Sequence, residues 1–326
     1  MKDNQTQIIK KITDILSRYS RFLLVVHQFP DGDTLASSLA LFIALRSLKK
    51  EVVIVCCDDI PAPFLFLPQV SKIKKDFLQG DWDAVLILDC GDLRRTGFSQ
   101  RLTNFARHKR KLINIDHHPK NDLHKVANIN LFDDKRAAVA ELVYEIINGL
   151  GVEIKKEIAT CLLTAIFTDT GGFMHSNTSP ATLELAALLL RRGARLRAIT
   201  QNITGSKSLS ALKLWGKTLE RLAYNKKYNL VYSVILNDDL RECNATKSDV
   251  AGVINLINTV PDARLVILFF QHSEHEIKVS IRTEAQGVNL SRLAGIFGGG
   301  GHKKAAGFCV NGKIFCKKEK YTIETV

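Results

Sequence analysis

Residues 22–41, FLLVVHQFPDGDTLASSLAL, run from an apolar segment through a polar turn into a segment with helical spacing. Similar short apolar runs rich in β-branched residues occur at 51–56 (EVVIVC), 84–88 (AVLIL) and 111–115 (KLINI), with enough chain between them for crossover helices. Strands that are apolar on both faces are typical of a buried parallel sheet. We therefore predict an α/β domain with a mostly parallel sheet and helices on both faces. The expected helices lie near 34–48, 137–148, 157–168 and 180–192.

The C-terminal third of the chain has a different pattern. Alternating strands are expected at 228–235, 264–270 and 277–282, with helical segments near 248–258 and 289–297. Asn311 and Gly312 stand between two short apolar runs, which predicts a hairpin turn. This pattern indicates a smaller α+β domain with a mixed sheet. Because 326 residues exceed one ordinary core, we predict domains at 1–200 and 228–326 joined by a basic helical linker at 201–227.

Composition narrows the class of protein. The chain is 46% hydrophobic and 24% charged, as in globular proteins. Its N-terminus lacks the apolar core of a signal peptide, and no apolar run approaches the roughly 20 residues of a membrane span, so we expect a cytoplasmic protein without a membrane partner. The seven cysteines include no CxxC pair, and we expect them to be reduced.

The net charge of +13 is unevenly distributed. Ten basic residues lie between Arg191 and Lys227, against the single acid Glu220. Such a segment would attract polyanions. A solvated helical linker would explain the same pattern, and the sequence leaves both interpretations open.

Carboxylate and imidazole side chains follow the predicted strands and one predicted helix. The carboxyl ends of neighbouring parallel strands meet at one edge of a sheet, where ligands bind. Taken singly, Asp33 is explained as a helix cap, Asp89 as a turn residue, and His117 or His118 as a buried histidine. Together, so many acids would repel one another unless cations lay among them. The residues concerned are His27, Asp31, Asp33, Asp89, Asp116, His117, His118 and Asp169.

The mixture of carboxylate and imidazole without thiolate favours Mn²⁺ first, and Mg²⁺ or another first-row ion second. Six candidate ligands are enough for two divalent cations, an arrangement suited to phosphoryl transfer. A second signal is the run FGGGGH at 297–302. Its glycines Gly299, Gly300 and Gly301 predict an anion-binding loop, which the neighbouring His302 and Arg282 would complete, although a flexible loop would also explain the run.

At these positions the sequence resembles the DHH phosphoesterase family, in its branch of short-oligoribonucleotide nucleases that also act as pAp phosphatases and carry a C-terminal DHH-associated domain. The resemblance spans nearly the whole chain. It rests on HQFPDGD (27–33), LDCGD (88–92), NIDHHPKN (114–121), TDTGGF (168–173), SNTSPAT (176–182), VSIRT (279–283) and FGGGGHKKAAGF (297–308).

The resemblance implies roles for the residues that match these motifs. His27, Asp31 and Asp89 would hold one metal ion, and Asp33, Asp89, His117 and Asp169 the other, with Asp89 bridging. His118 would face the substrate phosphate, and Asp116 would orient the histidines. Arg282, Gly299, Gly300, Gly301 and His302 would belong to a substrate-binding domain that holds the terminal nucleotide.

Three segments depart from the family pattern. The family often has Asn where Phe29 stands, small hydroxyl residues where Arg136–Val139 stand, and Arg-Tyr where Met174 and His175 stand. None of these is an implied metal ligand, so the departures bear on substrate preference.

The predicted function is that of a two-metal phosphoesterase. It would hydrolyse short single-stranded RNA to 5′-mononucleotides and pAp to AMP, with small nucleotides as its other partners. The alternatives are a phosphodiesterase for linear or cyclic dinucleotides of the di-AMP type and a catalytically silent nucleotide sensor. A homodimer is left open.

Overall fold

The computed structural model describes residues 2–77, 80–108, 111–118, 121–205, 207–317 and 320–325. The chain divides into two compact units, Met1–Gly205 and Ser206–Val326. In the described residues no helix is long and apolar enough to cross a membrane. The cysteines whose side chains are described are all free thiols.

The first unit contains a six-stranded sheet in the order β3-β2-β1-β4-β5-β6, in which every paired neighbour is parallel. This confirms the predicted α/β fold. The order places β1, β4 and β5 side by side at the centre. The strands are β1 (Arg21–Val25), β2 (Glu51–Val55), β3 (Ile73–Lys74), β4 (Ala84–Leu88), β5 (Lys111–Asp116) and β6 (Ile129–Phe132).

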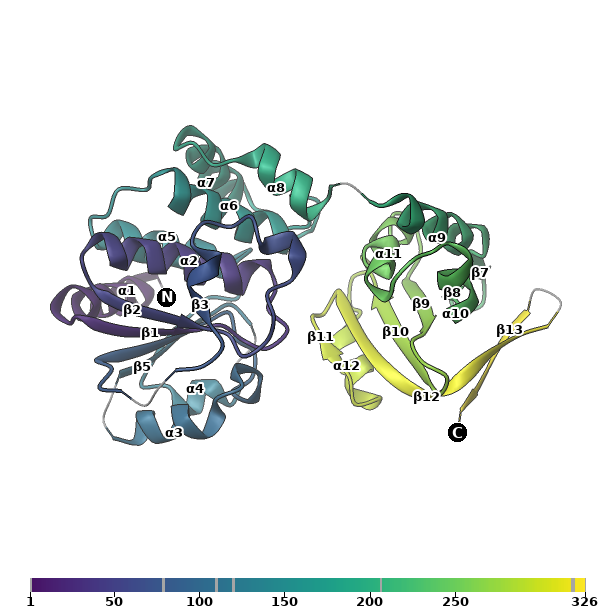
Figure 1. The fold of residues 1–326 in the computed structure, drawn as a ribbon, viewed down its shortest axis with the longest axis horizontal. Coiled ribbons are helices and arrows are strands. Elements are labelled where there is room, and N and C mark those ends of the chain that lie inside the picture. The colour runs from purple at the N-terminus through teal and green to yellow at the C-terminus, as the bar shows by residue number, and fades with distance from the viewer. Residues whose placement is uncertain are drawn as a thin grey trace. The chain divides into compact units, whose positions relative to one another are not determined.

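Helices cover both faces of this sheet (Figure 1). In β1, Phe22 and Leu24 face a core shared with helices α1, α2, α5 and α6, whereas Leu23 and Val25 face a core shared with α3. This double burial explains why the strand is apolar at every position from Phe22 to Val25. The helices of this unit are α1 (Lys2–Arg18), α2 (Gly32–Ser47), α3 (Ser99–Arg107), α4 (Leu123–Val126), α5 (Val139–Gly149), α6 (Lys156–Asp169), α7 (Pro180–Arg191) and α8 (Leu196–Ile203), with short 3₁₀ turns η1 (Ala62–Phe64), η2 (Val70–Lys72) and η3 (Arg94–Thr96).

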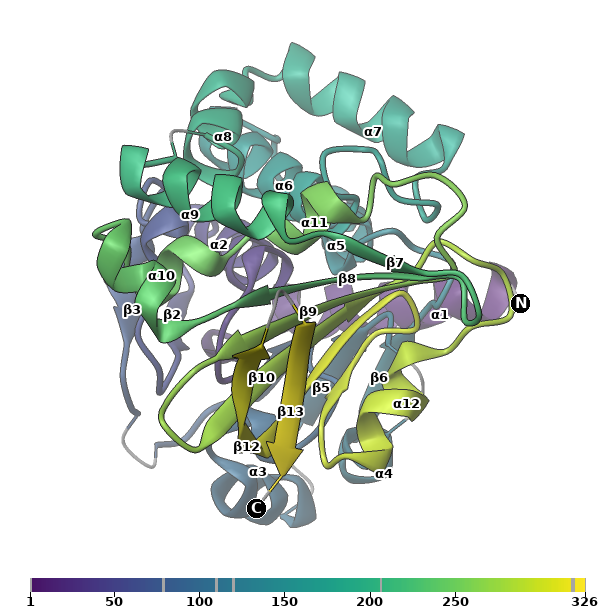
Figure 2. The same cartoon turned by 90° about the vertical axis from the view of Figure 1, so that its right-hand side faces the viewer.

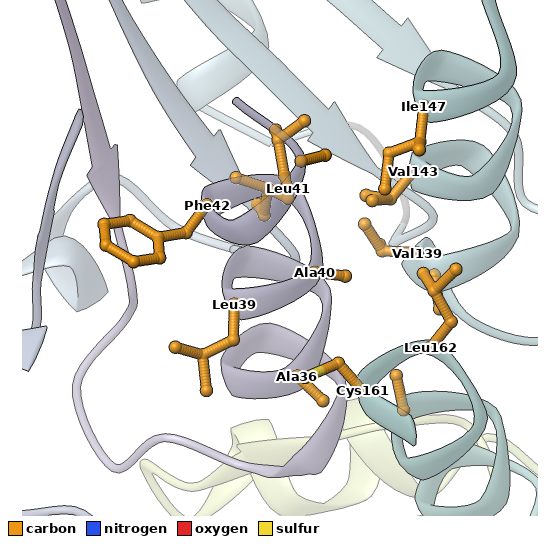
Figure 3. Close-up of a cluster of buried hydrophobic side chains, with 14 of the residues drawn as sticks. Ala36, Leu39, Ala40, Leu41, Phe42, Val139, Val143, Ile147, Cys161 and Leu162 are labelled. Carbon is orange, nitrogen blue, oxygen red and sulfur yellow. The ribbon is translucent and has the colours of Figure 1, made fainter. Parts of the chain in front are cut away.

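Helix α2 packs closely against α5 and α6. Its small side chains Ala36 and Ala40 are fully buried, and in Figure 3 they lie on the face of α2 that is turned to Cys161 and Val139. Small residues at such a contact let helix backbones approach closely, and a densely packed contact of this kind resists displacement. The first turn of α2 is therefore held in place against the start of α5 and the end of α6.

Local capping signals set the ends of two helices. The Ser179 side chain accepts a hydrogen bond from the Thr182 amide at 3.1 Å, Pro180 occupies the first turn of α7, and Gly193 follows the helix with a φ of +86°. Helix α2 begins at Gly32, two residues before the predicted start, because Asp31 caps it by accepting from the Thr34 amide.

The second unit has a mixed sheet, as predicted, in the order β11-β12-β10-β9-β8-β7 with β13 paired to β12. Only β8 and β9 are parallel among the pairs of this sheet that are described (Figure 2). One face packs on α9 and α11 and the other on α12. The elements are α9 (Leu209–Glu220), α10 (Asn237–Glu242), α11 (Val253–Ile257), α12 (Leu290–Ile296), η4 (Lys247–Val250), β7 (Ala223–Asn225), β8 (Leu230–Ile235), β9 (Leu265–Gln271), β10 (Glu276–Arg282), β11 (Gly300–Gly301), β12 (Ala305–Lys317) and β13 (Lys320–Thr325).

The segment expected to be a linker, 201–227, differs from the structure. Helix α9 and strand β7 lie inside this range and belong to the second unit. Leu214 of α9 is fully buried in the core of that unit, and the Trp215 indole donates to the Asp249 carbonyl. The basic residues of 191–227 are accordingly divided between the two units.

The predicted hairpin turn at Asn311 and Gly312 is wrong. Strand β12 runs through both residues, and neither has a positive φ of the kind that a two-residue hairpin turn requires. Asn311 is the last residue paired with β10, and Gly312 is the first paired with β13. Strand β12 therefore continues through this point, because its pairing with β10 ends where its pairing with β13 begins.

Candidate metal centre

The predicted ligands gather at the carboxyl edge of the parallel sheet. His27 lies just beyond β1, Asp89 directly follows β4, and His117 directly follows β5. The first turn of α2 supplies Asp33, and the last residue of α6 is Asp169. Because β1, β4 and β5 are neighbours, these side chains meet although they are far apart in the sequence.

Three groups of side chains could each hold a metal ion, since the ligand atoms within a group lie within 4.8 Å of one another. Asp89 belongs to two groups, and so does His117. The groups are His27, Asp31 and Asp89; Asp89, His117 and His118; and Asp33, His117 and Asp169. All six side chains singled out as ligands are present, together with His118.

Asp33 is completely buried and is held by the start of α5. Its carboxylate accepts hydrogen bonds from the Val139 and Ala140 amides and from the Ser37 hydroxyl. Amides in the first turn of a helix have no partner within that helix and carry partial positive charge. Asp33 therefore binds α5 and does not cap its own helix, which Asp31 does.

Asp116 orients both histidines of the DHH motif. Its Oδ1 accepts from the His117 and His118 amides and lies 2.8 Å from His118 Nδ1. The side chain is fully buried. A buried carboxylate on one imidazole nitrogen fixes the ring and leaves the other nitrogen for a ligand.

Contacts that the sequence did not reveal hold the rings of His117 and His27. His117 Nδ1 lies 3.0 Å from the Arg136 carbonyl oxygen, and its Nε2 lies 3.5 Å from Asp89 Oδ1 and 3.4 Å from Asp169 Oδ2. His27 Nδ1 lies 2.6 Å from the Gln28 carbonyl oxygen and 3.2 Å from an Arg95 nitrogen. Nothing in the pattern of ligand residues points to these contacts, because two of the partners are backbone carbonyl oxygens, which every residue has.

The charges of the cluster call for a cation. Burial, followed by the charges of neighbouring aspartates, raises the pKa of Asp89 and of Asp169 well above the usual value for a carboxyl group. Burial disfavours a charged His117, but the carboxylates of Asp89, Asp33 and Asp169 outweigh it and raise the pKa of His117 to about 11. The proton on His117 therefore compensates part of the negative charge of these aspartates. A divalent metal ion would compensate more of it.

The donor atoms also fit a metal. Asp89 Oδ1 and His117 Nε2 are buried and make no hydrogen bond with any of the residues that the structure describes. Buried polar atoms are rarely left in that state unless water or an ion binds them. The set contains oxygen and imidazole nitrogen and no thiolate, which suits Mn²⁺ or a related divalent ion.

The departures from the family pattern occupy different surroundings. The Arg136 guanidinium pairs with Asp133, Glu141 and Glu145, so carboxylates already engage it. His175 Nδ1 lies 3.2 Å from the Asp169 carbonyl oxygen, whereas the preceding Met174 is exposed. Phe29 is also exposed, between His27 and Asp31.

The predicted substrate-binding residues lie in the second unit. Arg282 ends β10, where Nε donates to Asn255, and no carboxylate pairs with it among the described residues. Gly299 is required by close packing, since a Cβ there would lie 2.2 Å from the Gly307 carbonyl oxygen. The amides of Gly298, Gly299 and His302 donate to backbone carbonyls, so these three do not form the predicted anion nest.

One aromatic contact beside this loop was not predicted. Phe297 stacks on Phe308 with ring centroids 4.5 Å apart and planes 13° apart, and Phe297 is half exposed. A pattern of apolar residues cannot distinguish such a pair from core residues, because the two rings come from a helix end and a strand.

Comparison with known proteins supports the same family. Residues 21–166 match the model of the DHH family N-terminal domain, and residues 227–319 match the DHHA1 domain. A protein of Thermus thermophilus named bifunctional oligoribonuclease and PAP phosphatase NrnA is 33% identical, over 93% of this chain and 88% of its own length. A Mycoplasma genitalium protein of the same name is 25% identical over 94% of this chain and 93% of its own.

The fold also matches a solved structure. The crystal structure of an exopolyphosphatase-related protein from Bacteroides fragilis superposes with a TM-score of 0.83 at 26% identity, covering 96% of this chain and 93% of the other. Both domain matches, their order and the relative at 33% identity confirm the predicted resemblance. The chain is a member of the DHH family and carries a C-terminal DHHA1 domain.

Proposed function

We propose that this protein is a metal-dependent phosphoesterase that hydrolyses short RNA oligonucleotides to 5′-mononucleotides and pAp to AMP. The observation that carries the proposal is the sharing of Asp89 and His117 between adjoining groups of ligand atoms. Shared ligands allow two cations to lie close together, as phosphoryl transfer by two metals requires. The relatives named as oligoribonuclease and PAP phosphatase support the substrate class.

In the proposed site His27, Asp31 and Asp89 hold one cation, and Asp33, Asp89, His117 and Asp169 hold the other. Mn²⁺ is the proposed ion because both carboxylate and imidazole suit it. When bound, the two cations supply Lewis-acid charge at the phosphate and lower the pKa of water.

Other residues act on the substrate or on the ligands. His118, whose Nδ1 lies 2.8 Å from Asp116 Oδ1, would donate a hydrogen bond to a phosphate oxygen. Asp116 is a positioning residue, since its Oδ1 accepts from the amides of His117 and His118 and also contacts the ring of His118. In the second unit we assign nucleotide binding to Arg282, His302 and the glycines 299–301.

A substrate panel tests the proposal. The purified protein is incubated under identical Mn²⁺ conditions with pAp, an RNA dinucleotide, a 24-mer and cyclic di-AMP, and products are separated by chromatography. We expect AMP from pAp and 5′-mononucleotides from the dinucleotide, with slower loss of the 24-mer and no turnover in EDTA. Faster degradation of the 24-mer, or a preference for cyclic di-AMP, would contradict the proposed substrate class.

The assignment of His302 has its own test. His302→Ala should raise the KM for pAp and leave kcat nearly unchanged, because a residue that binds ground state and transition state equally affects KM alone. His275→Ala is the control, since His275 is an exposed histidine on another loop of the same unit. A fall in kcat at constant KM would exclude a binding role for His302.

A further inference from the structure

Phe29 is an exposed aromatic residue at the edge of the candidate metal centre. Its side chain is 82% exposed, although it lies between His27 and Asp31 in the sequence. A single exposed hydrophobic side chain is common on protein surfaces, so exposure alone indicates no function. Its backbone conformation and its surroundings distinguish this residue.

The backbone of Phe29 adopts a left-handed conformation with a φ of +50°. Such a conformation is unfavourable for a bulky residue, and it precedes Pro30, which restricts it further. Neighbouring groups hold it in place. The Phe29 amide donates to Asp58 Oδ2 at 2.8 Å, and the Gln28 amide donates to the Arg95 carbonyl. The backbone at Phe29 is therefore held in this conformation with its side chain exposed, and strain of this kind is concentrated at functional sites.

The ring forms one wall of a pocket. An open surface hollow of about 440 Å³ is lined by Phe29, Pro30, Asp58, Asp59 and Pro61. This volume lies in the range that small-molecule sites occupy. Phe29 and Pro30, which line the pocket, lie in the same loop as His27 and Asp31. The pocket and the metal centre are therefore neighbours in the sequence.

The chemistry of the lining selects the part of the substrate that could enter. Asp58 and Asp59 would repel a phosphate, and among the described residues Lys75 forms an ion pair with Asp59 but not with Asp58. Carboxylate oxygens accept hydrogen bonds from exocyclic amino groups of a base and from ribose hydroxyls. An aromatic face adds stacking, which every nucleobase can make.

We infer that Phe29 is a specificity-determining residue that stacks on the nucleobase of the nucleotide whose phosphate lies at the metal centre. The inference rests on the proposed function and adds to it the place of the base in the first unit. Phe29 takes no part in bond breaking. It makes turnover depend on the presence of a base, which distinguishes nucleotides from phosphate esters without one.

The test compares pAp with its abasic analogue, in which hydrogen replaces the base. Phe29→Ala and Phe29→Asn should raise the KM for pAp by roughly tenfold, the size of one lost base stack. The KM for the abasic analogue and both kcat values should stay unchanged. Asn tolerates a positive φ, so Phe29→Asn should fold at least as well as the wild type. Phe29→Trp should restore a low KM for pAp.

Lys49→Asn is the matched control. Lys49 is also exposed with a positive φ, of +62°, and it does not line the pocket. Lys49→Asn should change neither the KM for pAp nor the KM for the abasic analogue. Equal rises for pAp and the abasic analogue in Phe29→Ala, or no rise for either, would overturn the inference while leaving the proposed function intact.

A binding measurement separates the two claims. The affinity of AMP and of ribose 5-phosphate for the Mn²⁺-loaded wild type and Phe29→Ala is measured by calorimetry. A roughly tenfold loss for AMP alone supports stacking even if the wild type hydrolyses neither pAp nor short RNA, a result that would refute the proposed function. AMP affinity that is equal in both proteins overturns the inference.

Discussion

A Cβ atom on Gly32 would lie 2.3 Å from Thr168 Oγ1. Gly32 separates Asp31 from Asp33, and Thr168 precedes Asp169. The contact thus brings together the first turn of α2 and the last turn of α6 at the point where each supplies ligands. The absence of a side chain at Gly32 is what permits the two ligand-bearing segments to approach.

Gly32→Ala should destabilise the fold by about 1–3 kcal/mol, because an inserted methyl group forces α2 and α6 apart. It should also weaken Mn²⁺ binding by displacing Asp33 from Asp169. Gly216→Ala is the control, since a Cβ there meets nothing within 4 Å and lies in a helix, where Ala is favoured by about 1 kcal/mol. Thermal unfolding with and without Mn²⁺ measures both effects. Equal stability of the two variants would show that the Gly32 contact is easily relaxed.

Asp89→Asn should lower turnover of pAp at least about 100-fold, because a lost ligand should cost more than a lost outer contact. Asn is preferred to Ala because residue 89 has a φ of +55°, which Asn tolerates. Stabilisation by Mn²⁺ should be lost.

Asp76→Asn serves as the control for Asp89→Asn. Asp76 pairs with Arg101 at the surface of the same unit and is absent from the ligand groups. The Asp76→Asn variant should match the wild type in its turnover of pAp and in its stabilisation by Mn²⁺. If Asp89→Asn behaved in the same way, Asp89 could not be a shared ligand.

Metal binding near pH 8 should release at least one proton, because the pKa of His117 is about 11 without metal and only a neutral imidazole binds a cation, while burial also raises the pKa of the ligands Asp89 and Asp169. Calorimetry in buffers of different ionisation enthalpy measures this release. The protonated His117 stabilises the metal-free fold fully below the unfolded pKa of 6.5, and this stabilisation is lost as pH rises towards 11. Mn²⁺ binding without proton release would contradict the predicted competition at His117.

Leu214→Ala should destabilise the second unit by about 2–5 kcal/mol, because this side chain of α9 is fully buried in the core of the unit. Leu212→Ala, on the same helix but 52% exposed, should change stability by less than about 0.5 kcal/mol. Chemical denaturation of both variants in a Trp82→Phe background, in which Trp215 is the remaining tryptophan, measures both effects by fluorescence. Equal effects would indicate that α9 is a linker, as the sequence alone suggested.

The sequence by itself determined the parallel sheet of the first unit and the chemistry at its edge. Runs such as AVLIL at 84–88 are apolar on both faces, the start of α7 follows from Ser179 and Pro180, and its end follows from Gly193. The sequence also predicted which Asp and His residues lie together, because the carboxyl ends of neighbouring parallel strands meet at one edge of the sheet. These signals are local or follow from strand direction, so they require no knowledge of which distant residues meet.

Only the tertiary structure decided the features that depend on distant partners. Asn311 and Gly312 continue a strand because β10 and β13 pair with it on either side. Asp33 binds the first turn of α5, more than one hundred residues away, and leaves the cap of α2 to Asp31. Phe29 became a candidate for base recognition only when its φ and its pocket were known. These contacts join residues that are far apart in the sequence. Which of them meet is decided by the packing of the whole domain, so the local sequence pattern does not predict them.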